Sequence, residues 1–411
     1  MSHTQISRRS FLAGSAFGAA LSTLAAPLAT SAEEVTKPKI QGFDETDTDV
    51  NVAEKWEPFT DRKLKMGIVG FGLCQFGAQF ELQNHPNVEV VAVSDLFPDR
   101  CAGLAKACRC EKTYESLEEM IKDDSIEAIF IATDAPSHCD HVIKALKAGK
   151  HVASAVPAIF GSLEDADRLY EAVKESGLFY GMFETSSFHD DVYMARKIYK
   201  AGGFGKMIYT EGEYYHYGVG TLAGYKNWRR GLPPQWYPTH SNAYYTCVTG
   251  NSFTKVSCVG FRSGLEEYQK DANPWDNPFG TEVALFSTSE GGSARMAVSW
   301  DSCGWGGETG RMRGEVGAVN GGYAPLNDAT REIVEKLGEL RKPALPPTVG
   351  AGGHGGSHGY LGSNFVESVL KNRHPLVNVA VALNTTVPGV VAHLSALKDG
   401  EQLDIPQYAM W

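Results

Sequence analysis

The stretch KLKMGIVGFG, residues 63–72, decides the fold of this chain. Its apolar first part leads directly into the closing GFG, a pattern typical of a first β-strand that ends in a glycine-rich, nucleotide-binding turn. We expect Gly70 to make the turn and Gly72 to let the backbone approach a pyrophosphate at the N-terminus of a following helix. Gln75 stands where the usual pattern has a third glycine.

The segments that follow alternate between apolar strands and helices. Strands are expected at VEVVAVSD (88–95), IEAIFIATD (126–134), HVASAV (151–156) and FYGMFE (179–184). Helices are expected over about 74–86, 114–123, 137–149 and 163–177. Strands that are apolar throughout and alternate with helices indicate a parallel sheet covered on both faces. The sequence therefore predicts an α/β fold with a doubly wound, NAD(P)-binding Rossmann domain over residues 63–187.

The pattern changes in the second half of the chain. After Lys206 apolar and polar residues alternate, and a Glu-Gly-Gly turn stands at 290–292. Such alternation is typical of a sheet with one packed face. We predict a substrate-binding α+β domain over 188–411 with an open, mainly antiparallel sheet. A Pro/Gly-rich loop (341–359), helices at 360–372 and about 379–397 and a short strand at LDIP should close it, with the last helix packing back toward the Rossmann domain.

The N-terminus has the layout of a bacterial twin-arginine export signal over residues 1–32. Arg8 and Arg9 precede a weakly apolar run, and a small-residue exit stands at Thr30-Ser31-Ala32. The run is too short and too rich in Ala, Gly and Ser for a stable membrane span. Residues 33–62 are polar and acidic and predict a linker or an arm on the surface. The expected location is periplasmic or extracellular, and this route exports proteins that are already folded.

Composition excludes several classes of partner. The net charge of −11, without a dense Lys/Arg cluster, argues against nucleic acid and anionic membranes. The eight cysteines form no Cys-x-x-Cys and are expected as free thiols, although a pair could oxidise after export. His354 and His358 have an i, i+4 spacing, but the surrounding glycines will not hold a helix, so we predict no metal site.

Asp95 decides which dinucleotide is expected. It ends the second predicted strand, where a carboxylate accepts hydrogen bonds from the adenosine ribose diol. The same carboxylate would repel a 2′-phosphate, so NAD is favoured over NADP.

The run IEAIFIATDAPSHCDHVIKALKAGKHVASAVP resembles the glucose–fructose oxidoreductase, inositol dehydrogenase and MocA (Gfo/Idh/MocA) family. The GHGG at 353–356 and the IPQY near the end match as well. The resemblance implies NAD(P)-dependent chemistry on sugars, cyclitols and related polyols. With the glycine turn, it implies that these residues contact the cofactor: Gly70, Phe71, Gly72, Leu73, Cys74, Asp95, Thr133, Asp134, Pro136, His138, Ala155, Val156 and Thr185.

The chain departs from ordinary dehydrogenases of that family at two catalytic positions. Ala155-Val156-Pro157 stands where they carry Glu-Lys-Pro, and Trp236 stands where they carry an aspartate, four residues before His240. The stretch WYPTHS instead resembles the NAD-dependent glycoside hydrolases of family 109, which share Tyr-Pro-Thr-His. That branch's glutamate is lost at Ala155, and Thr185 replaces an Asn that would contact the cofactor.

Hydride removal from a secondary hydroxyl also requires a base. His240 is the candidate, because its unperturbed pKa of ~6.5 suits proton transfer near neutrality. Tyr237 and Tyr214 are expected to orient or relay that proton. The predicted substrate contacts are Tyr214, His216, Trp228, Arg229, Tyr237, Thr239 and His240.

Three hypotheses follow for function. The first is an exported oxidoreductase acting on a sugar, cyclitol or glycoside. The second is a redox-neutral NAD-dependent glycosidase that oxidises, eliminates, adds water and reduces again. The third is a carbohydrate-binding protein without activity, which the missing lysine and aspartate keep open. By resemblance, a homo-oligomer (dimer or tetramer) is expected.

Overall fold

The computed structural model describes residues 40, 41, 43 and 55–411. The predicted signal peptide and much of the predicted arm lie outside the described residues. Ile40 and Phe43 are nonetheless buried. Lys200 donates a hydrogen bond to the Phe43 carbonyl, and Asn378 donates one to the Gln41 carbonyl. This part of the predicted arm is therefore anchored in the body of the protein.

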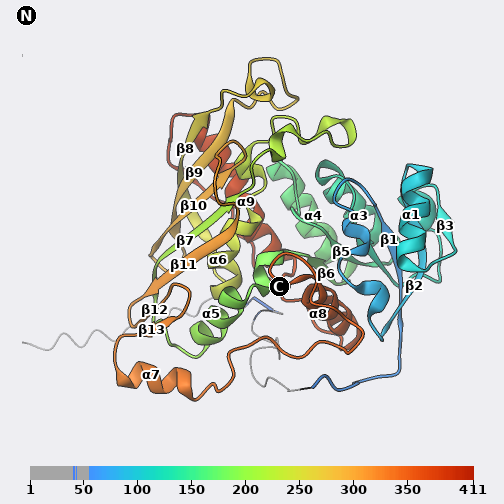
Figure 1. Ribbon diagram of the computed structural model, residues 1–411, viewed down its shortest axis with the longest axis horizontal. Helices are drawn as coiled ribbons and strands as arrows, with labels where there is room; N and C mark the ends of the chain where they lie inside the picture. The colour runs from blue at the N-terminus through green and yellow to red at the C-terminus, as the bar shows by residue number, and fades with distance from the viewer. Residues whose placement is uncertain (1–39, 42, 44–54) are drawn as a thin grey trace, which may run out of the picture. The chain divides into compact units, whose positions relative to one another are not determined.

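The first sheet has six parallel strands in the order β3-β2-β1-β4-β5-β6 (Figure 1). The strands are β1 (Leu64–Val69), β2 (Val88–Ser94), β3 (Thr113–Tyr114), β4 (Ala128–Ile131), β5 (His151–Ser154) and β6 (Tyr180–Met182). The helices are α1 (Pro98–Cys108), α2 (Leu117–Met120), α3 (His138–Lys147) and α4 (Leu163–Ser176). The strand order reverses between β1 and β4, which is where such sheets bind ligands. The predicted Rossmann fold is confirmed.

The segment after β1 differs from the prediction. Two short 3-10 turns, Phe76–Ala78 and Leu82–Asn84, replace the expected helix over 74–86. A left-handed residue precedes each turn, Gln75 with φ 53° and Glu81 with φ 59°, and such residues interrupt an α-helix. The glycine turn is therefore not followed by a long helix whose dipole could help to bind a pyrophosphate. Helix α1, in contrast, was not predicted.

The second sheet has eight strands in the order β13-β12-β11-β7-β10-β9-β8-β14. Its strands are β7 (Met207–Tyr215), β8 (Phe253–Arg262), β9 (Phe279–Thr288), β10 (Ser293–Ser299), β11 (Gly307–Gly314), β12 (Gly317–Val319), β13 (Tyr323–Pro325) and β14 (Leu403–Asp404). Only the β7–β10 pair is parallel, which agrees with the predicted mainly antiparallel sheet.

Helices cover one face of this sheet. The helices of this half are α5 (Asp190–Lys200), α6 (Thr239–Thr249), α7 (Asp328–Glu335), α8 (His358–Leu370) and α9 (Val379–Ala396). Figure 1 shows α6 and α9 on the side of the sheet that faces the Rossmann domain. Helix α6 packs closely on β7, because a Cβ on Gly212 would lie 2.0 Å from the Ser241 carbonyl oxygen. Helix α6, which carries Thr239 and His240, thus packs on the face of the second sheet that looks toward the Rossmann domain.

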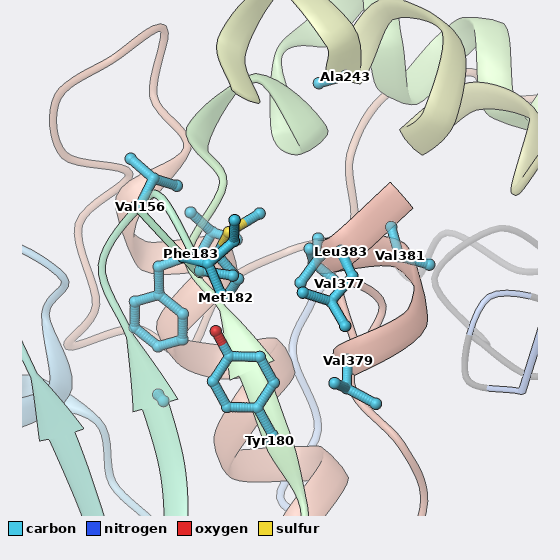
Figure 2. Close-up of a cluster of buried hydrophobic side chains, with 14 of the residues drawn as sticks. Val156, Tyr180, Met182, Phe183, Ala243, Val377, Val379, Val381 and Leu383 are labelled. Atoms are coloured by element: carbon cyan, nitrogen blue, oxygen red, sulfur yellow. The ribbon is translucent and has the colours of Figure 1, made fainter. Parts of the chain in front are cut away.

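Helix α9 joins the two halves of the core. It alone among the described helices is long and apolar enough to cross a membrane, but 94% of it is buried inside the protein. Figure 2 shows its Val379, Val381 and Leu383 beside the β6 residues Tyr180 and Met182. Its apolar surface therefore serves packing. The C-terminal segment also contacts the Rossmann domain, where the Tyr408 hydroxyl donates to the Asp167 carboxylate.

Candidate active site

A groove of about 190 Å³ lies at the carboxyl ends of β1, β2 and β4. The predicted cofactor contacts that line it are Gly70, Gly72, Leu73, Cys74, Asp95, Thr133, Asp134, His138, Ala155 and Val156. Phe71 and Pro136 are not in the lining, and Thr185 lines a second cavity instead. Most of the predicted set is thus brought together at the ligand-binding edge of the sheet.

The two glycines of the turn have different physical reasons to be glycine. Gly70 has φ 103°, and a Cβ there would lie 2.3 Å from the Ala132 carbonyl oxygen, so the fold itself requires glycine. Gly72 has an ordinary φ, and among the described residues no atom would lie within 4 Å of its Cβ. Neither packing nor backbone conformation requires glycine at 72, and the open space beside it fits a bound dinucleotide.

The Asp95 carboxylate is held at the end of β2. It accepts hydrogen bonds from the backbone N–H groups of Phe71 (2.6 Å) and Phe97 (2.9 Å). The carboxylate thereby ties the glycine turn to the second strand and lines the groove where an adenosine ribose is expected. Arg100, which was not among the predicted contacts, lines the same groove, with its guanidinium 4.5 Å from the Phe97 ring centroid.

His138 supports the groove from behind. Its Nδ1 lies 2.9 Å from the Pro157 carbonyl oxygen and its Nε2 lies 3.2 Å from that of Thr133. Burial lowers the pKa of His138, so the ring stays neutral. Both ring nitrogens face backbone carbonyls, but the neutral ring carries one N–H and donates to only one of them, so His138 ties one loop of the groove by a hydrogen bond.

A second cavity of about 270 Å³ adjoins the groove. The residues shared by both linings are Cys74, Phe76, Ala155, Val156, Arg229 and Tyr237. The others are Gln79, Phe80, Phe183, Thr185, Tyr214, His216, Val219, Leu222, His240 and His354. The two spaces meet at Ala155 and Val156, where the nicotinamide half of the cofactor is predicted.

His240 lies buried in the wall of the second cavity, between two carboxylates. Its Nδ1 is 2.8 Å from Glu184 Oε1 and 3.7 Å from Glu308 Oε1. Thr185 Oγ1 lies 3.2 Å from the same nitrogen. Since Nδ1 is engaged by the protein, Nε2 is the nitrogen left for a ligand. Neither glutamate was predicted as a site residue.

Glu308 extends this cluster toward α5. It stands opposite Tyr214 in the β11–β7 ladder, and its Oε2 accepts a hydrogen bond from Ser186 (2.8 Å) and lies 3.0 Å from His189 Nε2. The interaction with Glu308 outweighs burial and raises the pKa of His189. Although burial acts in the opposite sense, His240 and His189 hold the pKa of Glu308 below its ordinary value. Carboxylates and imidazoles therefore alternate through the cluster.

These charges correct the expected protonation of His240. Burial lowers its pKa, but Glu184 and Glu308 outweigh burial and raise the pKa to about 9. The expectation of an unperturbed value near neutrality is wrong. At neutral pH the ring of the free protein is an imidazolium, which donates a proton and becomes a base only on the alkaline side.

The two tyrosines occupy different positions. The Tyr214 ring lies edge-on to His240, with centroids 4.6 Å apart, and burial raises its pKa well above the ordinary value. Tyr237 donates its hydroxyl hydrogen bond to the Val156 carbonyl (3.2 Å), and burial raises its pKa to about 12. Tyr237 thus secures the loop between the two cavities, while Tyr214 is placed beside the imidazole.

The remaining predicted substrate contacts are divided between the two spaces. His216 lines the second cavity, Arg229 lines both, and Trp228 lines the groove only. Thr239 is fully buried at the start of α6 and belongs to neither lining, so its predicted contact is corrected. Trp236 packs among aromatic rings, with its ring centroid 5.2 Å from that of Phe160. It has no acid–base group to replace the family's aspartate.

Over residues 55–411 with 40, 41 and 43, no group of three or more His, Cys, Asp or Glu could hold a metal ion. The eight cysteines, all within the described range, are free thiols.

Comparison with known proteins agrees with this geometry. Residues 64–183 match the GFO/IDH/MocA family, described as "Oxidoreductase family, NAD-binding Rossmann fold". The chain is 29% identical over 170 residues to glycosyl hydrolase family 109 protein 1 of Bacteroides thetaiotaomicron, covering 37% of this chain and 34% of that protein. It is 29% identical over 153 residues to scyllo-inositol 2-dehydrogenase (NAD(+)) of Bacillus subtilis, covering 37% and 44%. These matches span about a third to under a half of the relatives.

Solved structures match over most of the chain. A levoglucosan dehydrogenase in complex with NADH and levoglucosan has a TM-score of 0.67 at 17% identity, covering 84% of this chain and 100% of that one. Scyllo-inositol dehydrogenase from Lactobacillus casei, with bound NAD(H) and scyllo-inositol, has a TM-score of 0.61 at 16% identity, covering 84% and 99%. At these identities the likeness shows the fold.

The groove thus belongs to a nucleotide-binding Rossmann fold of the kind that the oxidoreductase family model describes. Residues 64–183 match the NAD-binding Gfo/Idh/MocA oxidoreductase family, and over 84% of its length the chain has the fold of solved dehydrogenases such as the levoglucosan and scyllo-inositol enzymes.

Proposed function

We propose that this chain is an NAD-dependent oxidoreductase that transfers hydride from a ring secondary hydroxyl of a sugar, cyclitol or glycoside. One observation carries the proposal: the buried His240, flanked by Glu184 and Glu308, lines a cavity that joins the nucleotide groove at Ala155 and Val156. A proton-transfer group and a dinucleotide groove that share one wall suit hydride transfer.

The roles of the residues follow from their positions. NAD, when bound, supplies the hydride acceptor; Gly70, Gly72 and Asp95 would hold it. Glu184 fixes the His240 ring through Nδ1, which leaves Nε2 to exchange the hydroxyl proton. Tyr214 packs against that ring and lines the cavity, and the Arg229 guanidinium at the junction can donate to substrate oxygens.

Two measurements on the purified chain test this proposal. Denaturation should release stoichiometric dinucleotide if the cofactor stays bound through purification, and otherwise titration should give a measurable NAD affinity. A panel of cyclitols, free hexoses and aryl glycosides should then include a compound that generates NADH absorbance. A protein that neither holds nor binds NAD or NADP would remove the basis of the proposal.

A second candidate function is a redox-neutral glycosidase. It is favoured by Tyr237-Pro238-Thr239-His240, which matches the motif of glycoside hydrolase family 109, and by the relative of that name. Oxidation of a ring hydroxyl would acidify the neighbouring C–H, the aglycone would leave by elimination, water would add, and the hydride would return. Aglycone release without net NADH would select this function, and sugar binding without either reaction would indicate a carbohydrate-binding protein.

We also propose export by the twin-arginine route and assembly as a homo-oligomer. The signal over residues 1–32 supports export, and an enzyme that leaves the cytoplasm benefits from carrying NAD inside its fold. Exposed apolar side chains on the sheet, Val259, Phe261 and Leu285, support self-association. Fractionation of cells and light scattering of the purified chain would test the two points separately.

A further inference from the structure

A pair of histidines beside His240 has no role in the function proposed above. His354 lines the second cavity, and His358 stands behind it at the start of α8. The His354 Nδ1 and the His358 Nε2 are 2.9 Å apart, within hydrogen-bond distance. The other nitrogen of His358, Nδ1, lies 3.3 Å from the backbone N–H of Gly353.

These contacts determine where the protons of both rings lie. A backbone N–H can only donate, so His358 Nδ1 must accept and carries no proton. The proton of neutral His358 is then on Nε2, from which it faces His354 Nδ1. That nitrogen must in turn accept, which leaves the proton of His354 on its Nε2. Gly353 thus donates to His358, His358 donates to His354, and the remaining N–H of His354 is on Nε2.

Both rings are held neutral, as this order requires. Burial, together with the neighbouring His354, lowers the pKa of His358 to about 4, and the hydrogen bond with the Gln79 backbone does not offset this. Burial and the positive charge of His240 lower the pKa of His354. His354 Nε2 makes no hydrogen bond to the described part of the chain, and its ring lines the cavity. The N–H donor is therefore available to a ligand.

His354 is also held close to the candidate proton-transfer group. Its ring is nearly parallel to that of His240, at 21° with centroids 6.3 Å apart. His354 has φ 47°, a left-handed conformation that a non-glycine residue adopts at a cost. Ser357 Oγ donates to the His354 carbonyl oxygen at 2.8 Å and secures this turn. The turn thus presents one imidazole beside another at a fixed spacing.

We propose that His354 is a fixed hydrogen-bond donor to the substrate, with its proton placed by His358, and that His240 and His354 together select a substrate with two neighbouring ring oxygens. This proposal rests on the proposed function. His240 exchanges the proton of the reacting hydroxyl, and His354 donates to the oxygen on the adjacent carbon. The substrate class is therefore a cyclic vicinal diol, and compounds that lack the second oxygen are poor substrates.

The proton positions are tested without turnover by ¹⁵N NMR of the histidine-labelled full chain, with His354→Ala and His358→Ala used for assignment. The expected spectrum shows His358 protonated at Nε2 only and His354 protonated at Nε2 only at neutral pH. Addition of a cyclitol or hexose that binds should shift the His354 Nε2 signal. A proton on His354 Nδ1, or an Nε2 signal that no bound polyol moves, overturns the proposal.

The substrate class is tested by removing one hydroxyl and one imidazole in turn. With the most active compound of the panel, the analogue deoxygenated beside the reacting carbon should lose about tenfold in kcat/KM on wild type, the value of one hydrogen bond. His354→Ala should lose about tenfold on the parent compound and show no further loss on the analogue. If kcat/KM of His354→Ala still falls about tenfold from the parent compound to the deoxy analogue, another residue binds that oxygen and the proposal is overturned.

Matched variants separate the donor role from a structural role. His358→Gln can still accept from Gly353 and donate to His354, so it should retain most activity, whereas His358→Met should resemble His354→Ala. Ser357→Ala weakens the same turn without touching either ring and should keep the full loss for the deoxy analogue. If His358→Gln behaves as His358→Met, or Ser357→Ala as His354→Ala, the pair is structural. A wild type that transfers no hydride to any compound defeats the proposed function, while the NMR experiment still decides the proton positions.

Discussion

The imidazole of His240 and the carboxylate of Glu184 form a fully buried pair, with Nδ1 2.8 Å from Oε1. Glu184 Oε1 also accepts a hydrogen bond from the Ser186 backbone N–H (2.9 Å), and Glu184 Oε2 has no hydrogen-bond partner among the described residues. Glu308 adds a second negative charge at 3.7 Å. His240 is therefore an imidazolium at neutral pH. In this form it can donate a proton during reduction of a substrate ketone, and at higher pH the neutral ring can accept the hydroxyl proton during oxidation.

His240→Ala removes the proposed proton-transfer group. Turnover should fall by about 10²–10⁴-fold, the usual contribution of a positioned acid or base. NAD affinity should change little, because His240 lines the second cavity and not the groove. Steady-state kinetics and NAD titration check both parts. If His240→Ala keeps near-normal turnover while Tyr214→Phe abolishes it, the proton-transfer group is Tyr214.

Glu184→Gln tests the charge that raises the pKa of His240. Loss of the negative charge should move that pKa, about 9 in the wild type, to a lower value. Since oxidation needs the neutral ring, the wild-type rate should rise with pH toward about 9, and the rise of the variant should come at lower pH. Hydride-transfer rates measured across the pH range give both profiles.

Glu282→Gln is the matched control for that experiment. Glu282 and His393 form a similar buried pair, 2.7 Å apart, and neither residue lines the groove or the second cavity. The pH profile of hydride transfer in Glu282→Gln should equal that of the wild type. A Glu184→Gln profile that also equals the wild type would show that another group limits the rate.

Asp95→Ser should change cofactor preference. Removal of the carboxylate weakens binding of the ribose diol and relieves repulsion of a 2′-phosphate, so the ratio of NADP to NAD affinity should rise. Arg100, in the same groove, should contribute to NADP binding in this variant, and Asp95→Ser/Arg100→Ala should lose part of the gain. A wild type that already prefers NADP would contradict the role given to Asp95.

Gly72→Ala tests whether the turn approaches the cofactor, and Gly70→Ala tests whether the backbone of the turn requires glycine. Alanine at 72 meets no described atom within 4 Å, so the melting temperature should be kept while NAD affinity falls. Alanine at 70 clashes with backbone at 2.3 Å and must adopt φ 103°, so Gly70→Ala should lower the melting temperature. Thermal unfolding and NAD titration distinguish them; unchanged NAD affinity in Gly72→Ala would show that the turn does not approach the cofactor.

The alternation of strands and helices in the Rossmann fold and the position of the cofactor groove could be predicted because both follow from local sequence. An apolar strand ending at Gly70 and a second ending at Asp95 determine which edge of the sheet binds ligand. The 3-10 turns after β1 could not, because their apolar spacing resembles that of a helix and only the left-handed Gln75 and Glu81 reveal the breaks.

The charge of the site depends on contacts between distant segments. Glu308 is 68 positions from His240 in sequence (308 − 240) and reaches it through the pairing of β11 with β7. Glu184 is in a predicted strand end, where a carboxylate has no distinguishing pattern. A histidine pKa follows from such neighbours, so the sequence could identify His240 but could not give its protonation state.

The central claim is that His240 and the nucleotide groove act together in hydride transfer. The most direct test mixes the NAD-loaded chain with each compound of the polyol and glycoside panel in a single turnover and follows NADH absorbance together with aglycone release. We predict that at least one compound with neighbouring ring hydroxyls produces NADH, lasting or transient, and that His240→Ala with the same bound NAD does not. NADH formation that is equal in wild type and His240→Ala, or absent with every compound although NAD is bound, would contradict the claim.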